Sequence, residues 1–188
     1  VYFVTVIDQR QVVFPYEFDP PGWEGPTLRQ IRQAYAEALI GLNYVGLLDV
    51  ALYVSAQKTH CVDRFMQWHV HLLVWGISEA KLRRFCKDIR IGMRALLSYA
   101  TSVEYKRVRD GDLLQMVWYT TKAPRKQYQV WKRSRTDTLK QYKRKINGVN
   151  SVRLYAAMQD IKLDELTIAA GHGIRVMKRA LREVRQRS

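Results

Sequence analysis

The sequence predicts an α+β fold, with a central antiparallel sheet, helices packed on it, and a basic helical extension at the C-terminal end. Runs of β-branched and aromatic residues alternate with segments of helical period, in the order strand, helix, two strands, helix, strand, helix. The 188 residues are 47% hydrophobic and 26% charged, which is typical of a globular chain that buries a core. We expect one domain over residues 1–128 and the extension over residues 129–188.

The chain begins with a β-branched and aromatic run, residues 1–6, which predicts a central strand that breaks at the polar residues 8–10. Residues 14–25 are rich in Pro and Gly and predict a loop. Thr27 then precedes an apolar stripe with helical spacing, and Gln30 stands three residues later. This spacing is typical of a capping box at the start of a helix.

The next two strands carry the stretch around which the chain is organised. Residues 49–57 and 67–76 predict two strands, which most simply pair as an antiparallel hairpin across the loop 58–66. Because alternate side chains of a strand point to opposite faces, His69 and His71 project together on one side. The apolar residues of the same strand fill the other side: Trp68, Val70, Leu72 and Val74.

After this hairpin, helices and strands continue to alternate along the chain. Ser78 precedes an amphipathic helix, and residues 101–108 alternate as a half-exposed strand. Residues 113–122 predict a helix that ends at Ala123 and Pro124. Residues 163–184 predict one or two further helices. No internal repeat or low-complexity linker separates these elements.

The charge balance is the strongest global signal. The chain holds 32 Lys and Arg against 17 Asp and Glu, a formal net charge of +15. Residues 78–155 contain 20 basic and 6 acidic residues, whereas residues 1–77 contain 5 and 7. A basic block beside a neutral one is expected for a surface that binds the phosphate backbone of nucleic acids. An anionic membrane surface is a weaker alternative, because no Lys-rich amphipathic helix with an aromatic face is present.

Two motifs in order resemble the HUH endonuclease superfamily. His69 and His71 form a His-hydrophobic-His strand, and Tyr119 and Lys122 form a Tyr-x-x-Lys helix about fifty residues later. Residues 3–6 loosely match the early strand motif of that superfamily. Each motif alone is weak, and their order and the intervening elements make the resemblance more specific.

The resemblance implies an RRM-like core and a single-tyrosine enzyme: a rolling-circle replication initiator, or a relaxase or single-strand transposase. Such enzymes nick single-stranded or hairpin DNA at a specific site and stay joined to it through a 5′-phosphotyrosine. It implies Tyr119 as the nucleophile, Lys122 as a charge partner, and Mg²⁺ or Mn²⁺ held by His69 and His71. A free 3′-hydroxyl would suit a host polymerase, and a host helicase is a further expected partner.

The third metal ligand is the least defined residue of the site. The superfamily usually has an acidic or polar residue on the strand before the histidine pair, or near it. Gln57 is favoured because it has the strand parity of the histidine side, and Asp63 in the loop is the alternative. His60 lies in the same loop. A site poor in carboxylates is softer than a usual Mg²⁺ site.

The segment from 125 to 155 combines basic side chains with interleaved aromatic residues. Aromatic rings stack on unpaired bases, while Arg and Lys follow the phosphate backbone, so we expect this segment to contact DNA. A solvated basic helix is the alternative. The candidate DNA-binding residues are Arg125, Lys126, Lys132, Arg133 and Arg135.

Other interpretations remain open from the sequence alone. His69 and His71 could be structural strand residues, and Tyr119 could be a packed helix residue. The chain would then be a non-catalytic nucleic-acid-binding module. A zinc-dependent hydrolase ranks last, because no H-E-x-x-H or other zinc signature is present.

The sequence also bears on the cellular setting. No apolar run approaches the length of about 20 residues that a membrane span needs, and no secretory signal opens the chain. Cys61 and Cys86 have no ligand-like spacing and are expected to be reduced thiols of a cytoplasmic protein. Because Val1 stands in place of Met and a strand begins at once, we expect a piece of a longer chain.

Overall fold

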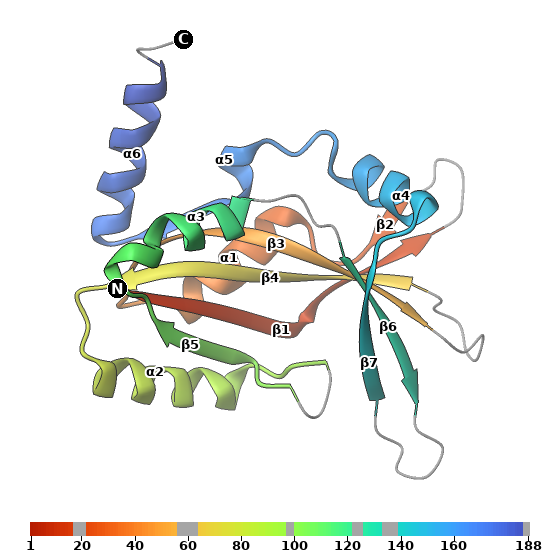
Figure 1. The fold of residues 1–188 in the computed structure, drawn as a ribbon, viewed down its shortest axis with the longest axis horizontal. Coiled ribbons are helices and arrows are strands. Elements are labelled where there is room, and N and C mark those ends of the chain that lie inside the picture. The colour runs from red at the N-terminus through yellow and green to blue at the C-terminus, as the bar shows by residue number, and fades with distance from the viewer. Residues whose placement is uncertain (17–21, 56–63, 97–99, 122–125, 133–138, 186–188) are drawn as a thin grey trace.

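The computed structural model describes residues 1–16, 22–55, 64–96, 100–121, 126–132 and 139–185 (Figure 1). A short 3-10 turn, Asp110–Asp112, precedes α3. In chain order the elements are β1 (Tyr2–Tyr16), β2 (Gly22–Glu24), α1 (Leu28–Ala38), β3 (Asn43–Ser55), β4 (Arg64–Trp75), α2 (Glu79–Gly92), β5 (Val103–Arg107), α3 (Leu113–Thr121), β6 (Lys126–Lys132), β7 (Leu139–Lys145), α4 (Gly148–Met158), α5 (Leu163–Leu166), β8 (Thr167–Ala170) and α6 (His172–Arg185).

The described strands form one curled sheet in the order β2-β1-β4-β3-β6-β7, with β5 paired to β1 and β8 paired to β3. The centre of this sheet is antiparallel, as predicted, but β6 runs parallel to β3. The fold is therefore α+β with a mixed sheet. In the view of Figure 1, α1 lies behind β3 and β4 while α3 lies in front of them.

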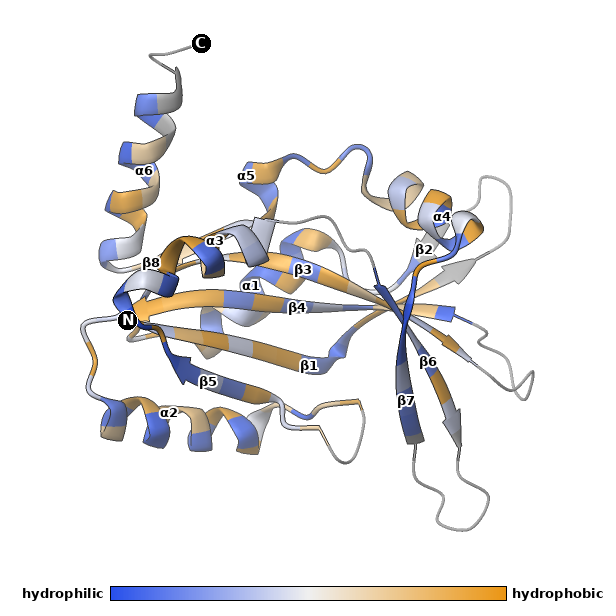
Figure 2. Ribbon diagram, in the orientation of Figure 1, coloured by the Kyte–Doolittle hydropathy of each residue, from blue (hydrophilic) through white to orange (hydrophobic). Residues whose placement is uncertain are grey.

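The antiparallel pair of β3 and β4 forms the middle of the core. The two strands pair without a break from Asn43 opposite Trp75 to Val54 opposite Arg64. Their even-numbered side chains point to one face and are buried against α1 and α2. Figure 2 shows hydrophobic residues along β3 and β4 and hydrophilic residues along β7. Burial of one face fixes the register, because a slip of one residue would turn every side chain to the opposite face.

Both predicted helix starts are confirmed. Thr27 caps α1, and its side chain and that of Gln30 make the reciprocal hydrogen bonds of a capping box. Ser78 caps α2 by accepting from the backbone N–H of Lys81. Such caps satisfy N–H groups that have no partner within the helix, and each contributes about 1 kcal/mol.

The boundaries of the first strands differ from the prediction. β1 continues past residues 8–10, where the pairing with β4 shifts register between Ile7 and Val12. The predicted break is therefore a bulge-like irregularity inside one strand. Part of the predicted loop 14–25 is also strand, because the end of β1 pairs with β2. β3 begins six residues before Asp49.

The expectation of a wholly helical C-terminal extension is wrong. Residues 126–132 and 139–145 form an antiparallel hairpin, β6 and β7, which extends the sheet beside β3. The boundary expected between residues 128 and 129 lies within β6. The helices α4, α5 and α6 follow, and β8 adds a short strand to β3. In Figure 1, α6 projects away from the sheet toward the C-terminal end.

Within the described residues, no helix has both the length and the apolarity needed to cross a membrane. Cys86 is a free, buried thiol in α2, and burial raises its pKa. Cys61 lies outside the described residues.

A glycine in β3 permits the close contact with β4, and we expect its replacement to destabilise the fold. A Cβ atom at Gly46 would lie 2.3 Å from the backbone oxygen of His71 and 2.5 Å from Cδ2 of Leu72. Gly46→Ala should lower the free energy of unfolding by about 2 kcal/mol, which corresponds to a melting temperature lower by about 4–8 °C. Differential scanning calorimetry measures both quantities.

Gly92→Ala is the matched control, because a Cβ atom there has nothing within 4 Å. Its melting temperature should stay within about 2 °C of the parent protein. Equal losses in the two variants would contradict the close approach of β3 to His71.

Candidate metal centre

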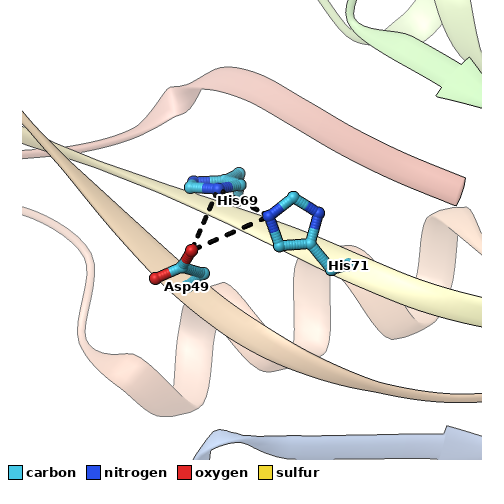
Figure 3. Close-up of side chains that lie close together, drawn as sticks. All are labelled: Asp49, His69 and His71. Atoms are coloured by element: carbon cyan, nitrogen blue, oxygen red, sulfur yellow. Dashed lines mark hydrogen bonds and ion pairs between the residues drawn. The ribbon is translucent and has the colours of Figure 1, made fainter. Parts of the chain in front are cut away.

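Two histidines and one aspartate converge on the sheet face that carries α3 (Figure 3). His69 and His71 occupy alternate positions of β4 and therefore project to the same face, as the sequence predicts. Asp49 lies on β3 directly opposite His69 in the strand register. The carboxylate and the two imidazoles thus come from two hydrogen-bonded strands in the middle of the sheet, which makes a rigid support.

The distances between the three groups suit one shared ion. Oδ2 of Asp49 lies 3.6 Å from Nε2 of His69 and 3.7 Å from Nε2 of His71, and the two Nε2 atoms are 3.2 Å apart. Ligands about 2.1 Å from one metal ion are separated by about 3.0 Å in octahedral and about 3.4 Å in tetrahedral geometry. Asp49, His69 and His71 could therefore hold a metal ion after small side-chain adjustments.

The protonation states also suit ligation. Burial lowers the pKa of His69 to about 4, so its imidazole is neutral at neutral pH. Burial acts to raise the pKa of Asp49, but the hydrogen bond from His71 and the electrostatic interaction with the two imidazoles outweigh burial, and the pKa is lowered. Metal ligands must be unprotonated, and these two groups meet that condition near neutral pH.

Neighbouring side chains hold His71 in place. Oγ1 of Thr5 lies 2.9 Å from Nδ1 of His71 in a hydrogen bond, while the opposite ring nitrogen, Nε2, faces Asp49. The ring of Phe3 stacks on His71 with centroids 5.4 Å apart and planes 21° apart. A partner on the second ring nitrogen fixes the tautomer and orientation of a metal-ligating histidine. β1 thus supplies the support that orients this ligand.

Tyr119 lies beside the cluster. Its ring packs edge-on against His71, with centroids 5.5 Å apart, and against Phe3, with centroids 6.1 Å apart. The side chain comes from α3, and the residue is 39% exposed. The structure therefore brings together the tyrosine and the histidine pair that the two sequence motifs singled out.

Three residues that the sequence analysis considered for the site lie outside the described part of the chain. Gln57, the favoured third ligand, and its alternative Asp63 are in the segment 56–63, and Lys122 follows the end of α3. The acidic group found beside the histidines is Asp49, which the sequence analysis did not select. It has the same strand parity as Gln57, and it is the only carboxylate at that parity in the predicted strand.

The candidate DNA-binding residues are only partly described. Lys126 is exposed at the start of β6, and Lys132 ends the same strand. Arg125, Arg133 and Arg135 lie outside the described residues. β7 adds basic side chains that are exposed on the same hairpin: Lys140, Lys143, Arg144 and Lys145.

The fold and the site together define an α+β protein with a His-His-Asp cluster on its sheet and a tyrosine packed against one histidine. Comparison of this chain with protein-family models, with curated proteins and with solved structures found no match.

The assignment of Asp49 leads to a direct test by isothermal titration calorimetry with Mn²⁺. We expect Asp49→Ala to weaken Mn²⁺ binding by at least about tenfold, because one of three protein ligands and its negative charge are lost. Asp88→Ala, which removes an exposed carboxylate of α2, should leave the affinity unchanged. Gln57→Ala should also leave it unchanged. A loss in Gln57→Ala with none in Asp49→Ala would identify Gln57 as the third ligand instead.

Proposed function

We propose that this protein nicks and rejoins single-stranded DNA in a metal-dependent reaction through a 5′-phosphotyrosine, as a replication initiator of the HUH endonuclease type. The observation that carries the proposal is the packing of the Tyr119 ring on His71 within the His-His-Asp cluster. A nucleophile, two imidazole nitrogens and a carboxylate are the groups that such a reaction needs, and they meet on one face of the sheet.

The reaction is a transesterification that starts from a weak nucleophile. A tyrosine hydroxyl has an ordinary pKa of about 10, so few phenolates exist at neutral pH. A bound Mg²⁺ or Mn²⁺ would withdraw electrons from a phosphate oxygen and orient the scissile bond. Asp49, His69 and His71 would hold that ion from one side, which leaves its other positions open to DNA and water.

Bond making and bond breaking then balance without any other reactant. The oxygen of Tyr119 forms a bond to phosphorus, and the bond from phosphorus to the 3′-oxygen breaks. Tyr119 loses its phenolic proton, and the leaving 3′-oxygen gains one proton to become the 3′-hydroxyl. Phe3 and His71 keep the phenol near the phosphate by packing against its ring. The phosphotyrosine retains the energy of the broken ester, so attack by a 3′-hydroxyl reverses the reaction and rejoins the strand. Lys122 is the residue expected to offset the negative charge of the phosphate.

The β6–β7 hairpin supports a single-stranded substrate. Tyr53 stacks between Phe65 and Tyr128, with ring centroids 4.8 Å and 5.0 Å away, and Nζ of Lys143 lies 5.5 Å above the Tyr128 ring. Aromatic rings beside basic side chains favour unpaired bases and the backbone that joins them. This surface belongs to the same sheet as the cluster, so one strand of DNA would contact both.

The single tyrosine supports one-tyrosine chemistry, and in a replication initiator a host polymerase would extend the free 3′-hydroxyl. A relaxase or a single-strand transposase would use the same groups in the same way. A host helicase would supply the unpaired strand. The test below addresses the shared chemistry.

Covalent capture tests the nucleophile. Incubation with single-stranded oligonucleotides and Mn²⁺ should yield a protein–DNA adduct on a denaturing gel, and Tyr119→Phe or EDTA should abolish it. Tyr2→Phe is the matched control, because Tyr2 packs against the core on the other face of β1 and should leave the adduct unchanged. Calorimetric melting of each variant excludes a general loss of fold.

The contrary result would point to another class of protein. Binding that weakens with salt, without an adduct on any sequence in a random pool, would identify a non-catalytic nucleic-acid-binding module. An adduct that survives in Tyr119→Phe would place the nucleophile elsewhere.

The basic hairpin makes a separate prediction about binding. Lys143→Ala should weaken the binding of single-stranded DNA and lower the slope of log affinity against log salt by about one, since one phosphate contact is lost. Lys87→Ala on the exposed side of α2 should change neither quantity. Fluorescence anisotropy over a series of salt concentrations measures both. Equal effects of the two variants would mean that the hairpin has no special part in binding.

A further inference from the structure

A cavity of about 350 Å³ opens beside the metal cluster, on the side of β1 and β5. Ligand-binding pockets begin at about this size, which suits one planar group and excludes a duplex. The cavity shares His71 and Tyr119 with the candidate site, and its other walls come from β1, β5 and α3. Its remaining lining residues are Phe3, Thr5, Glu104, Tyr105, Lys106 and Met116.

The walls of this cavity are flat and largely apolar. The rings of Phe3 and Tyr119 line it together with Met116, whereas the ring of Tyr105 packs against the core on the opposite face of β5. Phe3 and Tyr119 meet edge to face at 81°, so they present two surfaces at nearly a right angle. Unstacked nucleobases bind proteins by lying against such rings, and a base next to the phosphate at Tyr119 would reach them.

Among the lining residues, Glu104 and Lys106 bring a carboxylate and an ammonium group two residues apart on β5. Strand pairing places Glu104 opposite Thr5 and Lys106 opposite Phe3, so both side chains stand on the face that carries His71. Nζ of Lys106 lies 5.6 Å above the ring of Phe3. Oε1 of Glu104 accepts a hydrogen bond of 3.1 Å from Oγ1 of Thr101. A carboxylate accepts about four hydrogen bonds, so Thr101 orients Glu104 without using all its capacity.

A carboxylate at this position does not suit the DNA backbone. Glu104 is one of only 6 acidic residues among residues 78–155, against 20 basic ones. A negative charge beside a phosphate weakens the attraction that the basic residues supply. An uncharged donor fits Glu104 better, and the edges of nucleobases offer such donors.

Guanine matches both polar groups at once. Its Watson–Crick edge carries two adjacent donors, N1–H and the exocyclic amine, which a carboxylate accepts together. Its O6 and N7 atoms are acceptors that lysine recognises. Thymine lacks the amine, and its carbonyl groups would face the Glu104 carboxylate unfavourably. The base is therefore distinguished by donors toward Glu104 and acceptors toward Lys106.

We propose that this cavity binds one guanine base next to the phosphate at Tyr119, with Glu104 accepting from its N1–H and amine and Lys106 donating to O6 or N7. The inference rests on the proposed nicking function and names the nucleotide that its site selects. Glu104 and Lys106 then set sequence specificity, while the metal cluster and Tyr119 perform the reaction.

The test is a selection from a random pool of single-stranded DNA. The parent protein is incubated with the pool and Mn²⁺, and both the covalently held and the released fragments are sequenced. We expect guanine at one fixed position within about two nucleotides of the nick. Glu104→Gln should reduce the guanine preference at that position by about tenfold and leave other positions unchanged, because the amide offers a donor where an acceptor is needed.

Glu37→Gln, an exposed residue of α1, is the matched control and should keep the parent preference. Adducts with the same guanine preference in parent and Glu104→Gln would overturn this inference and leave the nicking proposal standing. A preference for thymine at that position would also overturn it.

A second selection, by binding alone with Tyr119→Phe protein, separates the two proposals if no adduct forms. The absence of any adduct overturns nicking. Guanine enrichment by the Tyr119→Phe protein would still support the cavity as a base-binding site if the double variant, Tyr119→Phe with Glu104→Gln, loses that enrichment. No enrichment in that selection would overturn the cavity proposal as well.

Discussion

The continuous antiparallel pairing of β3 with β4 is the constraint on which the site depends. Twelve residue pairs join the two strands, and the buried even-numbered side chains lock their register. That register places Asp49 opposite His69, and the odd parity of β4 adds His71 to the same face. A shift of one residue would move the histidines into the core. The metal cluster therefore follows from backbone hydrogen bonds and from apolar packing on the face away from it.

The sequence predicts most of this arrangement because its signals are local. Alternation in β4 gives the shared face of His69 and His71, and the spacing after Thr27 gives the start of α1. The sequence does not predict the register of β3 with β4, because the register depends on how the chain turns between the two strands. Strand parity allows either Asp49 or Gln57 to be the third ligand. β3 ends at Ser55, about 20 Å along the strand from Asp49. Only the register singles out Asp49.

The basic hairpin shows the opposite case, in which local signals mislead. In residues 126–132, polar and apolar side chains alternate only over the four residues 127–130, because Trp131 directly follows Val130, so the strand periodicity is short. β6 becomes a strand because it pairs with β3 at Leu52 to Ser55, a contact between segments more than seventy residues apart. Strand formation depends on such neighbours more than on intrinsic preference. The same pairing carries the ring of Tyr128 onto Tyr53.

The order of the strands places the parts of the proposed site in a row across the sheet. The cavity lies at β1 and β5, the metal cluster on β4 and β3, and the basic hairpin beyond β3. Four strand spacings, about 19 Å, separate β5 from β6. One extended strand of DNA would then contact all three places. The cavity would select a base, the metal cluster would position the neighbouring phosphate, and the basic hairpin would attract the backbone. A duplex presents neither a free base to the cavity nor an unpaired stretch to the aromatic rings, so the arrangement favours single-stranded DNA by geometry as well as by charge.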